Sequence, residues 1–414
     1  MKTHIGTTIL SRRTIGLAAA LACCHYHNLP SALAAPGSWT RKANLPMASG
    51  THAACAVDGI LYVVGGDTGT NTQSFVQQNT LFAYDPKTDS WTRKATMPTA
   101  RRFLAASAVD GIIYVIGGGG MGAPVTGAVE AYDPKTDKWV VKTKMPTPRC
   151  YPAACAVDGI IYTIGGAIAP SGSPVYMPTV EAYDPKTDHW TPKADLPTAE
   201  AVGAVNAVNG LIYACYGKDT FAYDPKTDSW TTKAPIPDLS LNSYLTASSA
   251  VGGMVYLFGG EPADSCTACD LTLAYDPVQD RFSAKRKMPM TCLGAAAATI
   301  DGKIYVADGL SADPLCGKAV AYNSLWVFDP QGGVAPQCVT LTAESTNQVR
   351  LVWKGEAGRL YGVESTLNIA TGPWRRALFS TGTNSIVATN ALVEANCEVS
   401  PADTNRFFRI IEAN

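Results

Sequence analysis

Arginine, glutamate and aromatic side chains recur at two equivalent positions of a repeated sequence block. The first position is occupied by Ser49, Arg101, Arg149, Glu200, Asn242 and Cys292. The second lies two residues later and is occupied by Thr51, Phe103, Tyr151, Val202, Tyr244 and Gly294. Arginine forks bind carboxylates and planar polar groups, and aromatic faces suit sugar rings. If the repeats form a ring, both sets lie near its centre and predict a ligand site there.

The candidate ligand-binding residues are the side chains at or beside these positions: Ser49, His52, Arg101, Arg102, Arg149, Tyr151, Glu200, Asn242 and Tyr244. The alternative is that the arginines and the glutamate bond only to neighbouring loop carbonyls. The sequence has no Gly-x-Ser-x-Gly elbow, phosphate-binding loop or His-Glu-x-x-His motif, so hydrolase and nucleotide-binding activities have no support. We expect neither a metal site nor a cofactor.

A group of cysteines indicates a second kind of chemistry. Four cysteines lie in two loops and one linker of two adjacent repeats, and we expect all four on the same face of the protein: Cys266, Cys269, Cys292 and Cys316. Four thiolates can bind zinc, whereas an oxidising compartment favours two disulfides between neighbouring repeats. Of these two alternatives we expect the disulfides.

Other cysteines lie farther apart in the sequence. Cys338 and Cys397 fall near the two ends of the C-terminal segment, and a bridge between them would stabilise a small core by about 2–4 kcal/mol. Cys55 and Cys155 occupy equivalent positions two repeats apart. We therefore expect these two to pack as small buried groups and not to pair.

The repeat that positions these residues has three landmarks. An Ala-rich stretch ends in a Gly turn, as in AACAVDG; an apolar run with a central Tyr ends in Gly-Gly; and a Tyr-Asp-Pro block such as YDPKTDSW ends in an aromatic. That aromatic recurs every 40 to 52 residues, at Trp39, Trp91, Trp139, Trp190, Trp230 and Phe282. Such a period is typical of propeller blades and not of helical solenoids.

Each repeat is predicted to be a four-stranded antiparallel sheet. AVDGILYVVGG contains two apolar runs joined by Asp58-Gly59, a dipeptide that tolerates the positive φ angles of a two-residue hairpin. In YDPKTDSW the Pro presets a turn, and a new strand begins near the Trp. The first strand of each repeat is rich in Ala, Ser and Gly, which suits strands that crowd around a common axis.

By its Gly-Gly doublets, spaced Tyr and Trp, the chain resembles the kelch-repeat family of β-propellers over about residues 38–331. The last repeat ends at SLWVFDP with three strands, and the chain begins its repeats at SWTRKANLP with a strand that has no preceding partners. We therefore predict an all-β protein with a six-bladed kelch propeller, residues 35–331, closed by the N-terminal strand.

Both ends of the chain differ from the repeat. Residues 1–34 carry Arg12-Arg13, a short apolar run and Ala32-Leu33-Ala34, which together predict a signal peptide of the twin-arginine type. Two basic residues of an ordinary secretory signal are the alternative. Residues 332–414 show alternating strands such as QVRLVWK and RFFRIIE, which resemble a small β-sandwich of the kind appended to secreted bacterial proteins.

Charge and hydropathy exclude several partners. Lys and Arg number 33 against 34 Asp and Glu, without a basic run, so we expect no nucleic-acid partner. The apolar run near the N-terminus is too short for a permanent span, and we expect no membrane span in the mature chain. An exported monomer, periplasmic or secreted, is the resulting prediction.

The preferred function is a non-catalytic binding protein, whose loop-rich propeller face binds a carbohydrate or an extracytoplasmic protein. Some secreted kelch propellers are copper oxidases, but the mature chain has only His52 and His189, predicted on opposite faces. Some periplasmic six-bladed kelch proteins open the ring of sialic acid. That similarity implies the alternative function, a cofactor-free sugar mutarotase, with Glu200 as acid or base and with Arg101 and Arg149 holding the substrate carboxylate.

Overall fold

The structure, a computed structural model, describes residues 37–68, 76–119, 124–168, 175–199, 202–237, 241–242, 246–262, 268–311 and 320–332, and seven strands between residues 337 and 412. Two compact units are present, Trp39–Pro330 and Met1–Ser38 with Gln331–Asn414. Every regular element in the described part of the chain is a strand. The predicted signal peptide, residues 1–34, lies outside the described residues.

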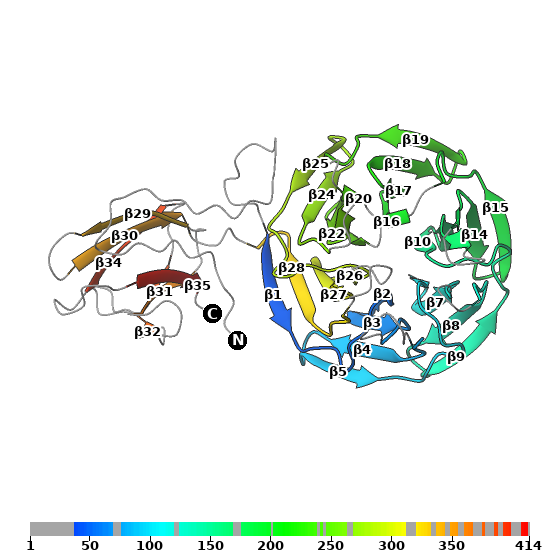
Figure 1. Ribbon diagram of the computed structural model, residues 1–414, viewed down its shortest axis with the longest axis horizontal. Coiled ribbons are helices and arrows are strands. Elements are labelled where there is room, and N and C mark those ends of the chain that lie inside the picture. Colours follow the sequence, from blue (N-terminus) through cyan, green and yellow to red (C-terminus); the bar gives the residue numbers. More distant parts are fainter. Residues whose placement is uncertain are drawn as a thin grey trace. The chain divides into compact units, whose positions relative to one another are not determined.

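Six four-stranded antiparallel sheets form a closed ring in the first unit (Figure 1). Blades one to three consist of β2 (Ala53–Val57), β3 (Ile60–Val64), β4 (Leu81–Asp85) and β5 (Ser90–Arg93); β6 (Ala105–Val109), β7 (Ile112–Ile116), β8 (Val129–Asp133) and β9 (Lys138–Lys142); and β10 (Ala153–Val157), β11 (Ile160–Ile164), β14 (Val180–Asp184) and β15 (His189–Lys193). Blades four and five consist of β16 (Val202–Val208), β17 (Leu211–Tyr216), β18 (Asp219–Asp224) and β19 (Ser229–Lys233); and β21 (Ala247–Val251), β22 (Met254–Phe258), β24 (Thr272–Asp276) and β25 (Arg281–Ala284).

The sixth blade joins the two ends of the repeat region. Its sheet has the order β1 (Ser38–Lys42), β28 (Leu325–Asp329), β27 (Lys303–Ala307) and β26 (Ala296–Ile300). Trp39 of β1 is buried, and its ring lies 5.0 Å from that of Phe328. The predicted six-bladed fold and its closure by the N-terminal strand are therefore confirmed.

Local turn chemistry sets the hairpin between the first two strands of each blade. Asp58 and Gly59 have φ angles of 52° and 76°, the left-handed pair that a type I′ turn requires. The same conformation recurs at Asp110-Gly111, Asp158-Gly159, Asn209-Gly210, Gly252-Gly253 and Asp301-Gly302. This turn matches the twist of the flanking strands, and the register of each inner hairpin follows from it.

The hydrophobic core lies between neighbouring blades and not within one sheet. Ile113 and Val115 of β7 are fully buried in a cluster that also contains Val57 of β2 and Leu81 of β4. Second strands are buried on both faces along most of their length, which explains why they read as continuous apolar runs. Each blade is therefore incomplete until its neighbour covers it.

The repeated YDPKTDSW block forms an inter-blade clamp, defined here by four groups in blades one and two. The Asp137 carboxylate accepts hydrogen bonds from the Tyr132 hydroxyl (2.7 Å) and from the backbone N–H of Ala95 (2.9 Å). Trp139 donates its indole N–H to the Ala95 carbonyl at 2.8 Å. The N–H and the carbonyl of Ala95 are thus both bonded by side chains of blade two. The hydrogen bonds that Asp137 accepts from Ala95 and Tyr132 lower the pKa of its carboxyl group.

The inter-blade clamp recurs around the ring, complete in blades one to four and partial in blades five and six; in blade six Phe328 takes the place of the Tyr and has no hydroxyl to donate. Equivalent indole bonds are made by Trp91, Trp190 and Trp230, and Trp39 bonds to the Arg286 carbonyl. In blade five the Ala234 N–H still donates to Asp280 at 2.9 Å, but Phe282 takes the place of the Trp and has no N–H to donate. The repetition in the sequence therefore encodes contacts between blades.

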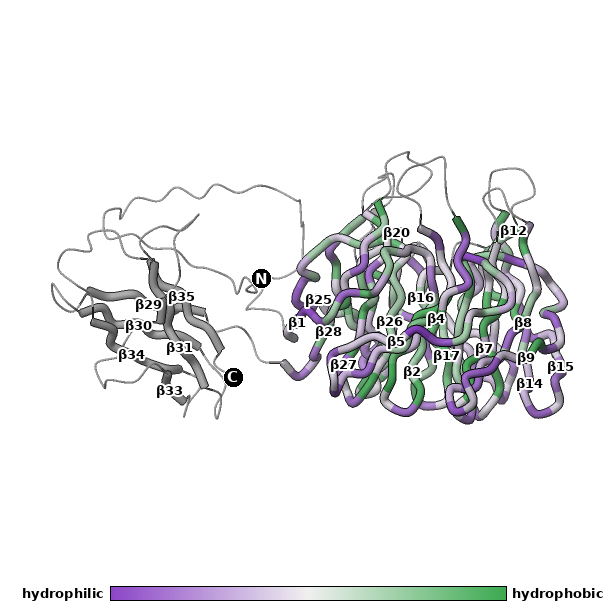
Figure 2. Tube along the Cα trace, turned by 90° about the horizontal axis from the view of Figure 1, so that it is seen from below, coloured by the Kyte–Doolittle hydropathy of each residue, from purple (hydrophilic) through white to green (hydrophobic). Residues whose placement is uncertain are grey.

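Two short strand pairs mark the edge of the propeller that we call the loop face. They are β12 (Ala167–Ile168) with β13 (Val175–Tyr176), and β20 (Leu241–Asn242) with β23 (Glu261–Pro262). In Figure 2, β12 and β20 lie at the same upper edge of the ring. The described parts of the linkers between blades reach the central channel at this edge.

The C-terminal unit contains two sheets. One has the order β29 (Gln337–Ala343), β30 (Gln348–Lys354) and β34 (Leu392–Glu398); in the other, β31 (Leu360–Thr366) pairs with β32 (Arg375–Arg376), β33 (Ser385–Val387) and β35 (Phe407–Glu412). The packing of these sheets as a β-sandwich stays a prediction. In the described residues no helix is long and apolar enough to cross a membrane.

Strand register argues against the expected bridge between Cys338 and Cys397. Cys338 is opposite Trp353, and Cys397 is opposite Val349, on the two strands that flank β30. Two strand spacings of about 4.8 Å and four residues of about 3.3 Å put the two Cα atoms roughly 16 Å apart. A disulfide requires less than about 7 Å, so this register does not favour the pairing, which stays a prediction.

Candidate functional site

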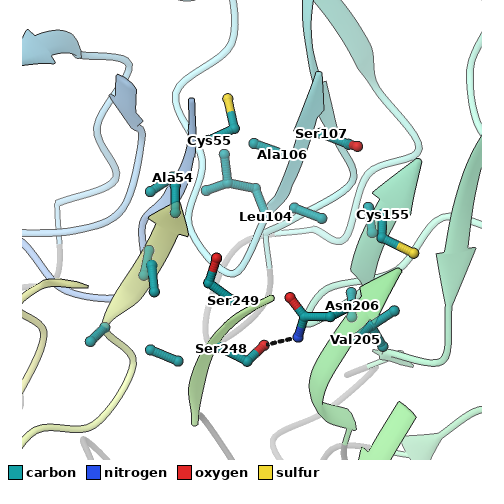
Figure 3. Close-up of a pocket in the computed structure, with 18 of the residues that line it drawn as sticks. Ala54, Cys55, Leu104, Ala106, Ser107, Cys155, Val205, Asn206, Ser248 and Ser249 are labelled. Atoms are coloured by element: carbon teal, nitrogen blue, oxygen red, sulfur yellow. Dashed lines mark hydrogen bonds between the residues drawn. The ribbon is translucent and has the colours of Figure 1, made fainter. Parts of the chain in front are cut away.

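A central cavity of about 460 Å³ runs between the innermost strands of all six blades. Its wall consists mainly of Ala, Ser and Gly, because six strands converge on one axis and leave little room for larger side chains. Figure 3 shows the lining, with Ala54 and Ala106 on one side and Asn206, Ser248 and Ser249 on another. We call the part of the lining that contains Asn206, Ser248 and Ser249 the polar side of the cavity.

Hydrogen bonds between blades order the polar side. Asn206 Nδ2 donates to Ser248 Oγ at 2.8 Å, which links blades four and five (Figure 3). The hydroxyls of Ser249 and Thr299 lie 2.8 Å apart, and Thr299 donates to the Ala250 carbonyl at 2.9 Å. These groups are largely paired with one another. The polar side therefore holds neighbouring blades together, and it could also contact a ligand in the cavity.

A chain of backbone hydrogen bonds surrounds part of the cavity mouth, and we call its four residues the collar: Gly294, Thr51, Phe103 and Tyr151. Each N–H donates to the carbonyl of the residue before it in this series, with lengths of 3.0, 3.0 and 2.9 Å. All four have positive φ, from 52° to 62°. Non-glycine residues hold this conformation at a cost of about 1–3 kcal/mol, most often at sites that need fixed backbone.

Two aromatic rings of the collar are stacked. The ring centroids of Phe103 and Tyr151 are 4.0 Å apart with an interplanar angle of 32°. The Arg102 guanidinium lies 4.9 Å from the Phe103 ring centroid and forms a buried ion pair with Asp67 at 3.1 Å. Phe103 is 4% exposed, whereas Tyr151 is only half-buried. Tyr151 is therefore the outer member of a supported aromatic stack that lines the cavity.

The two arginines expected to face a ligand are buried instead. Arg101 is 1% exposed and forms an ion pair with Glu130 at 3.1 Å, and its Nη2 also donates to the Val115 carbonyl at 3.0 Å. Thr99 donates to the second oxygen of Glu130 at 2.7 Å. The guanidinium thus fastens the linker that precedes blade two to the strands of that blade.

Blade three repeats this arrangement. Arg149 is fully buried and pairs with Glu181 at 2.9 Å, while Thr147 donates to the same carboxylate at 2.9 Å. Arg149 Nη2 also donates to Thr163 Oγ1 at 3.1 Å. The expected ring of accessible guanidinium groups is not what the structure shows, because desolvated charges with close partners are not open to a ligand.

A sequence signal for these ion pairs was available. Blades with Arg at the linker position have Glu in the third strand, in the shared motif VEAYD. Blades without that Arg have an apolar residue there, as with Ser49 and Phe82 in blade one or Cys292 and Trp326 in blade six. Covariation between repeats of the same chain therefore indicates the partner of each arginine.

The remaining predicted residues fall into two groups. Ser49 and His52 are buried, and burial lowers the pKa of His52 to about 4, so the imidazole is neutral at physiological pH. Glu200 and Tyr244 lie outside the described residues, and Asn242 is described only as part of β20. Among the described candidates, Tyr151 alone combines cavity lining with partial exposure.

The four-cysteine group is described in part. Cys269 and Cys292 are paired across an isolated antiparallel bridge, whereas Cys266 and Cys316 lie outside the described residues. No group of three or more His, Cys, Asp or Glu residues within the described ranges could hold a metal ion. Cys55 is buried among apolar side chains, and burial raises the pKa of the Cys55 thiol to about 12.

Comparison with known proteins finds similarity to kelch repeats. A family model described as the KLHDC2/KLHL20/DRC7 Kelch-repeats domain matches residues 35–217. Kelch-like ECH-associated protein 1B of Danio rerio is 34% identical over 82 residues, and Kelch repeat and BTB domain-containing protein 12 of Danio rerio is 36% identical over 86 residues. Each match covers 20% of this chain and 14% of the relative. Kelch-like protein 13 of Homo sapiens is 33% identical over 67 residues, 16% of this chain and 10% of that protein.

Proposed function

Because the chain carries a kelch-repeat β-propeller, we propose that it is an exported, non-catalytic binding protein that captures a protein partner on its loop face. The observation that carries the proposal is the partly exposed side chain of Tyr151, whose ring is stacked on that of Phe103 in a collar of fixed backbone. An apolar side chain of the partner would contact this ring. Export follows from the signal-peptide prediction for residues 1–34.

The collar suits binding because its backbone is already fixed by intramolecular hydrogen bonds before a partner binds. Its backbone is hydrogen-bonded from blade six through blade three, and the Phe103 ring is held between Arg102 and Tyr151. A pre-ordered aromatic side chain loses little conformational freedom on binding, which is why Tyr is common among the residues that dominate interfaces. The name of one relative, Kelch-like ECH-associated protein 1B, describes that relative as associated with ECH.

Burial of the arginines weakens the mutarotase alternative. That reaction would require Arg101 and Arg149 to hold a substrate carboxylate, but both guanidinium groups are already paired with glutamates at 3.1 and 2.9 Å. Freeing one arginine would leave the charge of its glutamate buried without a counter-charge, at a cost of about 3–5 kcal/mol. The aromatic ring of Tyr151 could also bind a sugar without catalysis. The glycan-array experiment described below distinguishes a carbohydrate ligand from a protein partner.

Site-specific photocrosslinking tests the proposal. A benzophenone amino acid replaces Tyr151 in the full chain, expressed in cells that produce the protein, and the matched control carries the same group at Val140. Val140 is 56% exposed on β9, an outer strand of blade two. We expect a discrete protein adduct from position 151 and none from position 140. The captured partner should bind Tyr151→Ala about tenfold more weakly, as expected for loss of roughly 1.4 kcal/mol at an aromatic contact.

A glycan array probed with the same proteins separates the two ligand classes. Glycan binding that depends on Tyr151, with no protein adduct, would replace the protein partner by a carbohydrate. Adducts of equal yield and identity at positions 151 and 140 would refute the collar as the binding site.

A further inference from the structure

Two cysteines that belong to different blades face each other across a short antiparallel bridge. Cys269 precedes β24 of blade five, and Cys292 lies in the linker between β25 and β26, which leads into blade six. The backbone N–H of Cys292 donates to the carbonyl of Cys269 at 3.1 Å. Residues opposite each other in an antiparallel pair have Cα atoms about 4.5–5.5 Å apart, which lies inside the range of about 4.4–6.8 Å found for disulfides.

The backbone on both sides of the pair is fixed by further hydrogen bonds. Gly260 N–H donates to the Cys292 carbonyl at 3.0 Å, and Cys269 N–H donates to the Gly260 carbonyl at 2.9 Å. Gly259 makes room for Cys292, since a Cβ at Gly259 would lie 2.6 Å from the Cys292 sulfur. The glycine doublet of blade five therefore places the two cysteines side by side and keeps them there.

We propose that Cys269 and Cys292 form a disulfide that ties blade five to the linker entering blade six. Both side chains are free thiols in this structure, and Sγ of Cys292 lies 3.9 Å from Sδ of Met288. Oxidation requires the Cys292 sulfur to rotate away from Met288 toward Cys269, while the backbone keeps its observed pairing. The proposal is independent of the binding function proposed above.

The bond forms by two thiol–disulfide exchanges with a disulfide oxidant, such as oxidised glutathione or a dithiol oxidase of the export compartment. One cysteine thiolate attacks the oxidant, which produces a mixed disulfide and releases the first oxidant thiolate. The second cysteine thiolate attacks the protein sulfur of this mixed disulfide and displaces the second oxidant thiolate. Two electrons pass to the oxidant, and the two cysteine protons end on its released thiolates.

Burial sets when this reaction can occur. Desolvation raises the pKa of the Cys292 thiol well above its usual range and also raises that of Cys269. Since the thiolate is the reactive species, exchange at these sulfurs is slow once the propeller has closed. The disulfide therefore forms while blades five and six are assembling, and the folded protein afterwards shields it from reductants.

Peptide mapping of the full-length protein tests the pairing. The reduced, unfolded protein is refolded with oxidised and reduced glutathione, alkylated and digested with trypsin without reduction. We expect the peptide of residues 288–303 joined to that of residues 234–281, at the summed mass less two hydrogens. The second peptide also contains Cys266. The link must therefore persist in Cys266→Ser and disappear in Cys269→Ser.

Thermal unfolding supplies a second readout. Closing the loop of about 24 residues between the two cysteines should raise the thermal midpoint by roughly 5 °C. A reductant present during unfolding should remove this increment from the parent and from Cys266→Ser, and should leave Cys269→Ser unchanged. Cys269 is chosen for substitution because Cys292 is fully buried and its replacement would disturb packing.

Three results would overturn the proposal. The first is a link that persists in Cys269→Ser and is lost in Cys266→Ser, which would assign the partner of Cys292 to Cys266. The second is alkylation of both Cys269 and Cys292 after oxidative refolding. The third is a stoichiometric soft metal ion, zinc or copper, bound with both thiols intact, since thiolates and the nearby thioether of Met288 are ligands for such ions.

Discussion

Blade five lacks the indole of the inter-blade clamp, and restoring it should stabilise the protein. Phe282 occupies the position where Trp139 of blade two donates to the Ala95 carbonyl at 2.8 Å. The equivalent acceptor beside Phe282 is the carbonyl of Ala234, whose N–H is already held by Asp280 at 2.9 Å. Phe282→Trp adds the missing donor, and Trp139→Phe removes one that is present.

The expected magnitude follows from the exposure of the groups involved. A net hydrogen bond contributes about 0.5–1.5 kcal/mol. Phe282 and Ala234 are both half-buried, so water can reach this site, and the low end of the range applies. We expect Phe282→Trp to raise the free energy of unfolding by about 0.5–1 kcal/mol and Trp139→Phe to lower it by about 1 kcal/mol, which includes the smaller apolar area of Phe.

Urea unfolding monitored by far-ultraviolet circular dichroism measures both changes, because the midpoint of the transition can be compared between proteins whose signal amplitudes differ. The transition midpoints of the two variants should move in opposite directions from that of the parent, with equal slopes. The double variant should show the sum of both changes, since blades two and five are far apart. A destabilised Phe282→Trp protein, or a Trp139→Phe protein with an unchanged midpoint, would refute the clamp as a source of stability.

Three further predictions concern buried charges. Arg101→Ala should lower the free energy of unfolding by about 3–5 kcal/mol in urea titration because Glu130 loses its partner, and the Arg101→Met, Glu130→Met double variant should recover much of this loss. Burial raises the pKa of Asp308 from 3.8 to about 6, so the folded protein binds this proton more tightly than the unfolded chain does. Stability should therefore gain about 2 kcal/mol from Asp308 as the pH falls from about 7 to 4, and Asp308→Asn should lack this gain in a pH series of thermal midpoints. Burial lowers the pKa of His52 from 6.5 to about 4, so the folded protein binds this proton less tightly than the unfolded chain does. His52 should therefore lower the stability by about 3 kcal/mol as the pH falls over the same range. A His52→Gln protein with the full acid sensitivity of the parent would contradict this.

Much of the propeller could be predicted because its determinants are local and repeated. Asp58-Gly59 and its counterparts adopt left-handed turn angles that few other dipeptides tolerate, so they fix the inner hairpins directly. The strand from Ser38 to Lys42 has no partner within its own segment, and an incomplete last repeat needs one more strand. Counting strands was therefore enough to predict six blades and their closure.

The candidate site was less predictable, because it depends on which groups meet across the ring. Arg101 and Arg149 occupy linker positions next to the cavity mouth, but Glu130 and Glu181 of the third strands draw their guanidinium groups into the blades. Tyr151 stacks on Phe103 of the adjoining linker and is only half-buried. These outcomes follow from contacts between residues about 30 positions or more apart.

The sequence by itself determined the structure of each blade. The two-residue turns and the apolar strand patterns act over a few residues, and they are repeated in all six blades. Only the tertiary structure decided which polar groups stay accessible. Burial of an arginine depends on a carboxylate in another strand, and the approach of Cys269 to Cys292 depends on the junction between two blades. Charges and thiols are governed by their nearest neighbours in space, and those neighbours are known only once the ring has closed.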